Sequence, residues 1–171
     1  MGAEWQAFLQ ALTVVAVVAS AVLLAVLQLT ARRWRGASLK EAAAASAVGE
    51  LLVPLLGGLV ALMPGASWRI GFLAAGGLAV CGLVAHVTTY LRHDDTADTF
   101  DDRQVQWGLP LSAAVCLSLL AFSCSTADWA AHVVAGLSVA LVFSGTARAW
   151  LLLAHLDRAA GAPAPLPTVS R

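Results

Sequence analysis

The sequence predicts an all-α protein, a polytopic integral membrane protein built as a bundle of five transmembrane helices. Hydrophobic residues make up 60% of its 171 positions and charged residues only 12%, whereas a soluble domain is nearer to half apolar and a quarter charged. A bilayer core about 30 Å thick is crossed by roughly 20 apolar residues in a helix. Five runs of that length are present, at residues 5–31, 42–63, 70–91, 105–124 and 129–153.

The runs leave almost no chain for a soluble domain, so residues 1–156 form a single membrane domain. The first run has no basic segment before it and is longer than the apolar stretch of about 7 to 15 residues in a signal peptide, so it is retained as a span. Residues 92–104 form an acidic loop. Residues 157–171 are rich in Pro and Ala and have little to bury, which predicts a disordered tail.

Lys and Arg counts in the short loops predict the orientation of the bundle. Cytoplasmic loops carry an excess of basic residues, and Trp collects at both membrane interfaces. The basic residues follow the first, third and fifth runs: Arg32, Arg33, Arg35, Lys40, Arg92, Arg103, Arg158 and Arg171. The alternate loops hold only Arg69. The amino terminus is therefore expected outside and the carboxyl terminus in the cytoplasm of a cell-membrane protein.

The second run contains a carboxylate, Glu50, in the middle of the apolar sequence GELLVPLLGG. Pro54 cannot donate to the carbonyl four residues earlier, which is that of Glu50. At 100° per residue, Glu50 shares one stripe with Pro54, Gly57 and Ala61. Small residues let helix backbones approach closely in a membrane, so this stripe is expected to face the bundle.

The third run carries a similar stripe that includes Ala79, Gly82 and His86. Only a short connection separates the second and third runs, so they should form an antiparallel hairpin. Folding this hairpin about residue 66 places Glu50 level with Gly82, one turn from His86. Because side chains lean toward the amino end of their own helix, Glu50 and His86 lean toward each other. We expect a contact between them, direct or through water.

The fifth run repeats small residues every four positions and ends in a charge: Gly136, Ala140, Ser144 and Arg148. If this helix ends near residue 153, Arg148 lies about 7 to 9 Å inside the boundary, close in depth to Glu50 and His86. Arg148 either completes a three-member polar cluster or extends its long side chain to the inner headgroups, and the second interpretation is preferred.

Five carboxylates crowd the acidic loop: Asp94, Asp95, Asp98, Asp101 and Asp102. Oxygen ligands suit hard cations, but the calcium-loop spacing is absent, so a solvated face is the main expectation and a metal site the alternative. His86 and His132 lie near opposite sides of the membrane and cannot share a haem. No cofactor and no nucleic-acid partner is expected, and the HExxH, P-loop and dinucleotide-binding glycine motifs are absent.

The leading functional hypothesis is a non-enzymatic subunit or accessory protein of a membrane assembly. It would associate through its small-residue stripes with itself or with another membrane protein. The alternative is a proton-coupled transporter or a cation or proton channel, in which Glu50 binds the proton, His86 relays it and Arg148 modulates it, because ionisable residues inside a membrane mark function by default. A third interpretation is that Glu50 has a purely structural role and holds helices together.

Overall fold

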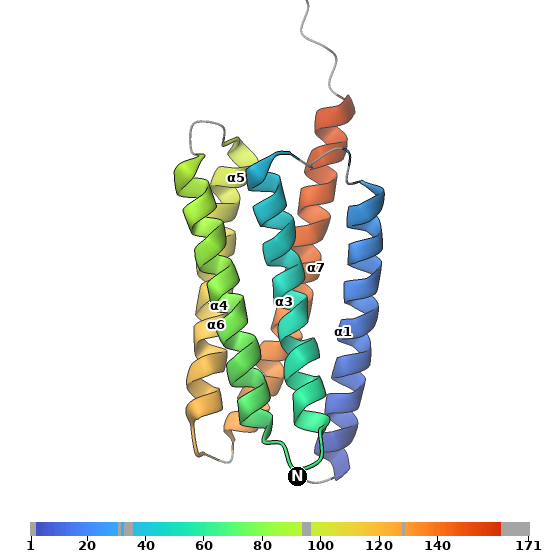
Figure 1. Ribbon diagram of the computed structural model, residues 1–171, viewed down its shortest axis with the longest axis vertical. Helices are drawn as coiled ribbons and strands as arrows, with labels where there is room; N and C mark the ends of the chain where they lie inside the picture. Colours follow the sequence, from blue (N-terminus) through green and yellow to red (C-terminus); the bar gives the residue numbers. More distant parts are fainter. Residues whose placement is uncertain (1–2, 31, 33–35, 94–96, 128, 162–171) are drawn as a thin grey trace, which may run out of the picture.

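The protein is a bundle of long helices in the computed structural model, which describes residues 3–30, 32, 36–93, 97–127 and 129–161 (Figure 1). The elements are α1 (Ala3–Leu29), α3 (Ser38–Leu62), α4 (Trp68–Arg92), α5 (Thr99–Arg103), η2 (Gln104–Gly108), α6 (Leu109–Cys124) and α7 (Ala130–Gly161). Five helical segments are long and apolar enough to cross a membrane, with α5, η2 and α6 counted as one.

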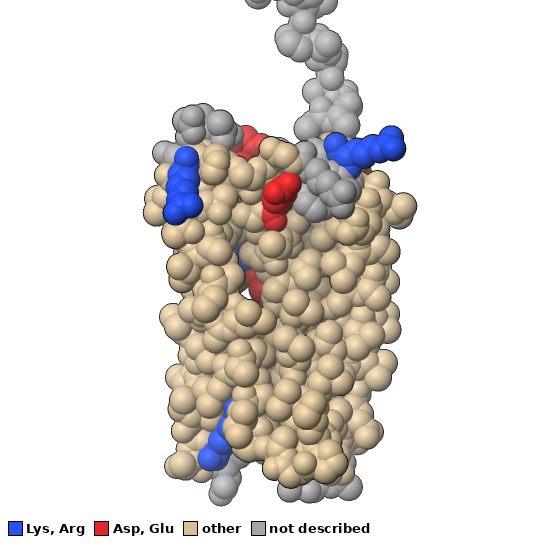
Figure 2. All heavy atoms as spheres, in the orientation of Figure 1, with Lys and Arg blue, Asp and Glu red and all other residues tan. Residues whose placement is uncertain are grey.

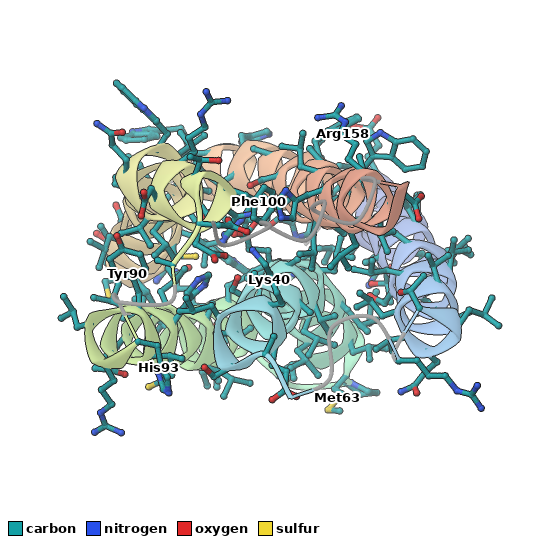
Figure 3. The ribbon with its side chains drawn as sticks, turned by 90° about the horizontal axis from the view of Figure 1, so that it is seen from above. Lys40, Met63, Tyr90, His93, Phe100 and Arg158 are labelled. Carbon is teal, nitrogen blue, oxygen red and sulfur yellow. The ribbon has the colours of Figure 1, made fainter. Side chains whose placement is uncertain are left out.

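Four helices close into a ring. Helix α3 packs against α4, α4 against α6, α6 against α7, and α7 against α3. Helix α1 lies outside this ring, against α3 and α7, as the view down the bundle shows (Figure 3). Helix α3 is therefore the most enclosed helix, with half of its apolar window buried.

The hairpin of α3 and α4 is confirmed. Ser67 caps the start of α4 by accepting from the backbone N–H of Arg69. Gly65 in the connecting turn has a φ of +77°, a conformation that glycine adopts without strain. At the crossing of the two helices, a Cβ added to Gly71 would lie 2.8 Å from the carbonyl oxygen of Gly57, so the absence of side chains lets the backbones touch. The small-residue prediction therefore holds for Gly57.

The predicted helix ends differ from the observed ones in two places. The fourth span begins at Thr99, six residues earlier than predicted, because Asp98 and Asp101 form a capping box that starts α5 inside the acidic loop. Helix α7 continues to Gly161, so part of the predicted disordered tail is helical; residues 162–171 lie outside the described part of the chain.

Only some of the predicted packing residues pack within this chain. Pro54, Gly57, Ala61 and Ala79 are buried, and Ser144 is half-buried. Gly82, Gly136 and Ala140 are exposed, and a Cβ built on either glycine would meet nothing within 4 Å. For these three the predicted packing is wrong within the chain, because α4 and α7 turn other faces toward their neighbours.

Candidate functional site

A polar cluster at the centre of the bundle brings Glu50 and Arg148 together. Glu50 lies midway along α3, about 18 Å from either end, and Arg148 lies about 20 Å from the end of α7. The two side chains form a salt bridge between Arg148 Nη1 and Glu50 Oε1. Glu50 is 2% exposed and Arg148 is 6% exposed. The preferred sequence interpretation of Arg148, extension to the headgroups, is therefore wrong, because α7 continues well beyond the assumed end.

The Glu50 carboxylate receives hydrogen bonds from two further helices. Ser112 Oγ of α6 donates to Oε1 over 2.5 Å, and Ser144 Oγ of α7 donates to Oε2 over 2.7 Å. The carboxylate thus has partners on both oxygens, one of them a charge. Such donors repay part of the free energy that is lost when a carboxylate is removed from water.

All five N–H groups of the Arg148 guanidinium have an acceptor. Nη1 donates to Glu50 Oε1. It also donates to Ser112 Oγ, at 3.0 Å. Nη2 donates to Ser46 Oγ at 3.0 Å and to Gln104 Oε1 at 2.9 Å. Nε donates to the same Gln104 oxygen at 3.2 Å. The charge is paired and the donors are satisfied, which is the condition under which a buried ion pair is tolerated.

Gln104 reaches the cluster from a local distortion of the helix. It begins η2, a π-helical turn in which the N–H of Leu109 bonds to the carbonyl of Gln104, five residues back. Pro110 follows and has no N–H to give to the preceding turn, so the regular ladder is interrupted there. Single π turns are frequent at functional sites. Here the wide turn accompanies a buried amide that binds Arg148.

His86 joins the cluster through Ser46. Its Nδ1 lies 3.1 Å from Ser46 Oγ, and the Ser46 hydroxyl donates to the carbonyl of Ala43 at 2.9 Å. Since a hydroxyl has one proton, Nδ1 of His86 is then the donor. The expected partner of His86 was Glu50; Ser46 takes that place and Glu50 pairs with Arg148. The cluster nevertheless gathers Glu50 of α3, His86 of α4 and Arg148 of α7, and Ser112 adds a fourth helix, α6.

Gly145 permits the close approach of α7 to α3 at this depth. A Cβ on Gly145 would lie 2.9 Å from the Ala47 carbonyl oxygen, 3.1 Å from Leu51 and 3.2 Å from the Cβ of Glu50. The sequence reasoning missed Gly145, Ser112 and Gln104. For Gln104 and Ser112 a signal existed, since both are polar residues in or beside an apolar run.

Two hollows approach the cluster from different sides. A cavity of about 270 Å³ between α3, α4 and α6 is bordered by Ser46, Glu50 and Cys116 among mostly apolar residues. Figure 2 shows an opening in this face, with acidic and basic atoms at its floor. A larger groove of about 600 Å³ between α5, η2, α6 and α7 reaches Ser144 and Arg148.

A second polar cluster closes the end of the bundle at which α5 lies, called the α5 end here. Lys40 Nζ contacts Asp98 Oδ2 and Asp101 Oδ1, both at 2.9 Å, and lies 4.9 Å from the centre of the Phe100 ring. His155 Nε2 lies 3.0 Å from Asp98 Oδ2. Figure 3 shows Lys40 and Phe100 in the middle of this end. These contacts tie α3, α5 and α7 together.

Asp98 is held ionised in this cluster. Partial burial alone would raise its pKa, but the hydrogen bond and charge of Lys40, a backbone bond from Asp101 and the charge of His155 together lower the pKa from 3.8 to about 2. Part of the acidic loop is therefore held in place by ion pairs and hydrogen bonds, and it is less solvated than expected.

The carboxylates of the acidic loop have protein partners where they are described. Asp102 accepts from the Tyr90 hydroxyl at 2.8 Å, and Asp98 and Asp101 bind Lys40. Asp94 and Asp95 lie outside the described residues. Among the described part of the chain, no three His, Cys, Asp or Glu side chains are grouped so that they could hold a metal ion.

Comparisons with protein-family models, with curated proteins and with solved structures find no match to this chain.

Proposed function

We propose that the protein crosses a cell membrane five times, with its amino terminus outside and its carboxyl terminus in the cytoplasm. The five apolar helices support the crossings. The excess of Lys and Arg at the α5 end supports the orientation. In lipid the buried Glu50 and Arg148 must be sheltered by protein, as their burial allows.

Within that membrane, we propose that the chain is a non-enzymatic subunit or accessory protein of a membrane assembly. One observation carries this proposal. The Glu50 carboxylate is already bound by the guanidinium of Arg148 and by the hydroxyls of Ser112 and Ser144. A carboxylate so engaged is poorly placed to act as a base or to bind an exchangeable cation. It is well placed to fix the rotation of α3, α6 and α7, and so to hold a rigid outer surface for a partner.

The partner surface that fits best is the outward side of α7 around Gly136 and Ala140. Both residues are exposed, and the space beside Gly136 is open. Exposed small residues allow a second helix to approach closely, and van der Waals packing of this kind drives helix association in membranes. The partner is a second copy of this chain or another membrane protein.

The test is extraction in a mild detergent followed by measurement of the protein mass in the complex. The wild type should be recovered above its monomer mass of 17.6 kDa. Gly136→Leu should release the monomer, while Ala121→Leu, on the exposed side of α6, should not. A wild type recovered only as a monomer, or equal loss in both variants, would contradict the proposal.

A second candidate function, proton-coupled transport or conduction, is favoured by the two hollows that reach opposite partners of one ion pair. In this function Glu50 takes up the proton when Arg148 moves away, and His86 relays it through Ser46. Purified protein in liposomes should then carry protons or cations, and Glu50→Gln should abolish the flux while the protein still folds. Liposomes no more permeable than empty ones would remove this candidate.

A further inference from the structure

The groove between α7 and the α5, η2 and α6 segment has a polar end and an apolar end. Along one wall, Arg103, Trp107 and Leu111 follow each other at intervals of four residues, about 6 Å per step. Along the other wall, Arg158 lies toward the α5 end and Leu151 lies deeper. Exposed charge is thus concentrated at the α5 end of the groove, because the deeper Arg148 is buried and paired with Glu50. Apolar side chains are exposed below it. This is the polarity of a phospholipid lying parallel to the helices.

The charge in the groove is positive and only partly balanced. Among the described residues that border it, none is an Asp or a Glu. Arg148 is neutralised by Glu50, and His155 faces Asp98. Arg103 and Arg158 are exposed, and neither forms an ion pair with a described carboxylate. Figure 3 shows Arg158 at the outer edge of α7, on the side where α5 lies. Two guanidinium groups, one from each wall, therefore stand at the mouth of the groove.

The deeper part of the groove offers apolar surface without a partner. Trp107 is 72% exposed, Leu111 62% and Leu151 57%. Trp favours the level of the headgroups, where its ring has apolar and polar surroundings at once. Leucines one turn deeper suit an acyl chain. The groove volume of about 600 Å³ exceeds that of a single phosphate and has room for part of a lipid chain.

We propose that this groove binds one anionic phospholipid. Its phosphate lies between Arg103 and Arg158, where guanidinium groups can bind phosphate oxygens in pairs. One acyl chain follows Trp107, Leu111 and Leu151 along the groove, away from the α5 end and parallel to the helices. Basic pockets between transmembrane helices on the cytoplasmic side bind lipid headgroups in this manner. The site is independent of the proposed partner surface, which lies around Gly136.

Native mass spectrometry of the full chain in mixed micelles tests the proposal directly. The probes are phosphatidylglycerol, which is anionic, and phosphatidylcholine, whose phosphate is balanced by choline. The wild type should retain one phosphatidylglycerol in preference to phosphatidylcholine. A basic residue near an anionic headgroup contributes about five-fold in binding, so Arg103→Gln with Arg158→Gln should weaken phosphatidylglycerol binding about 25-fold. The matched control Arg92→Gln, exposed at the same end of the bundle, should leave it unchanged.

Three further results separate lipid binding from its alternatives. The double variant Arg103→Lys with Arg158→Lys should restore most of the preference, because it keeps the charge. Equal retention of both lipids by the wild type would show that the acyl chain alone binds, and would overturn the proposal. Displacement of phosphatidylglycerol by inorganic phosphate at equal concentration would identify a soluble anion site, and would also overturn it. Circular dichroism of each variant confirms that the helices persist.

Discussion

Breaking the Glu50 and Arg148 pair from one side should be more harmful than removing it entirely. Arg148→Met leaves the Glu50 carboxyl group 2% exposed, with only the hydroxyls of Ser112 and Ser144 as partners. Loss of one member of a buried pair costs about 3–5 kcal/mol, because the other charge stays buried without compensation. Glu50→Leu, by the same reasoning, leaves a buried guanidinium and should have a similar effect on the free energy of unfolding.

The combined variant Glu50→Leu with Arg148→Met removes both charges and leaves side chains of similar volume. Its serine neighbours can turn their hydroxyls to the carbonyl four residues earlier in their own helices, as Thr13, Ser123 and Ser138 do in this protein. The combined loss should therefore be smaller than that of either single variant. The coupling free energy should then exceed the cost of a single variant, about 3 kcal/mol or more, which places it at or above the upper end of the usual range for residues in contact.

The assay is reversible unfolding in mixed micelles of mild detergent and dodecyl sulfate, followed by circular dichroism. Arg92→Met, an exposed change at the end of α4, supplies the control and should alter the free energy of unfolding by no more than about 0.5 kcal/mol. Single-variant losses that add to the combined loss would refute the reasoning, because residues that do not interact behave additively.

Three other changes test the packing, the α5 end and the wide turn. Gly145→Ala should destabilise the protein by about 1–3 kcal/mol, since its Cβ meets a backbone oxygen of α3 at 2.9 Å. Gly136→Ala should not destabilise it. Equal effects of the two variants in the unfolding assay would contradict this expectation. The pKa of Asp98 falls from 3.8 to about 2 on folding, so its stabilisation is complete above pH 4 and is lost as the pH falls through 2. Asp98→Asn keeps a capping side chain but should remove this part of the acid sensitivity, and an unchanged pH profile would count against the pairing with lysine. Gln104→Leu should lower the free energy of unfolding by about 1–3 kcal/mol, because it removes two hydrogen bonds from the buried guanidinium of Arg148. Gln106→Leu, at an exposed position, should have little effect. A larger loss in Gln106→Leu than in Gln104→Leu would argue against the role of the wide turn.

The apolar runs predicted the five long helices because their length reflects one strong physical requirement. A helix that spans lipid must be apolar for about 20 residues. Their ends were less predictable. The start of α5 depends on the capping box of Asp98 and Asp101, and α7 continues to Gly161 although its last residues are not strongly apolar.

The greater length of α7 explains why Arg148 lies inside the bundle. With an end near residue 153, a long basic side chain reaches the headgroups, and the sequence favours that outcome. With the observed end about 20 Å away, the side chain turns to Glu50 instead. The sequence could place Glu50, His86 and Arg148 at related depths. It could not choose their partners, because a shift of one turn in one helix exchanges them.

Helix rotation was the least predictable property, because these helices are apolar on most of their sides. In water, an apolar stripe marks the buried face of a helix, but lipid tails are as apolar as leucine and exert no such preference. Gly136 and Gly145 differ by nine residues, which is half a turn at 100° per residue, so one faces outward and the other α3. The sequence gives both the same chemical character.

Polar side chains break this ambiguity only when their partners are known. Hydroxyls inside apolar helices have two options: Ser138 bonds to the carbonyl of Val134 in its own helix, while Ser144, six residues on, donates to Glu50. Both options satisfy the hydroxyl, so the residue type alone does not distinguish them. Glu50 has no such internal option, since an ionised carboxylate only accepts. It must gather donors from neighbouring helices, and the rotation of α6 and α7 in this bundle is the one that supplies Ser112, Ser144 and Arg148.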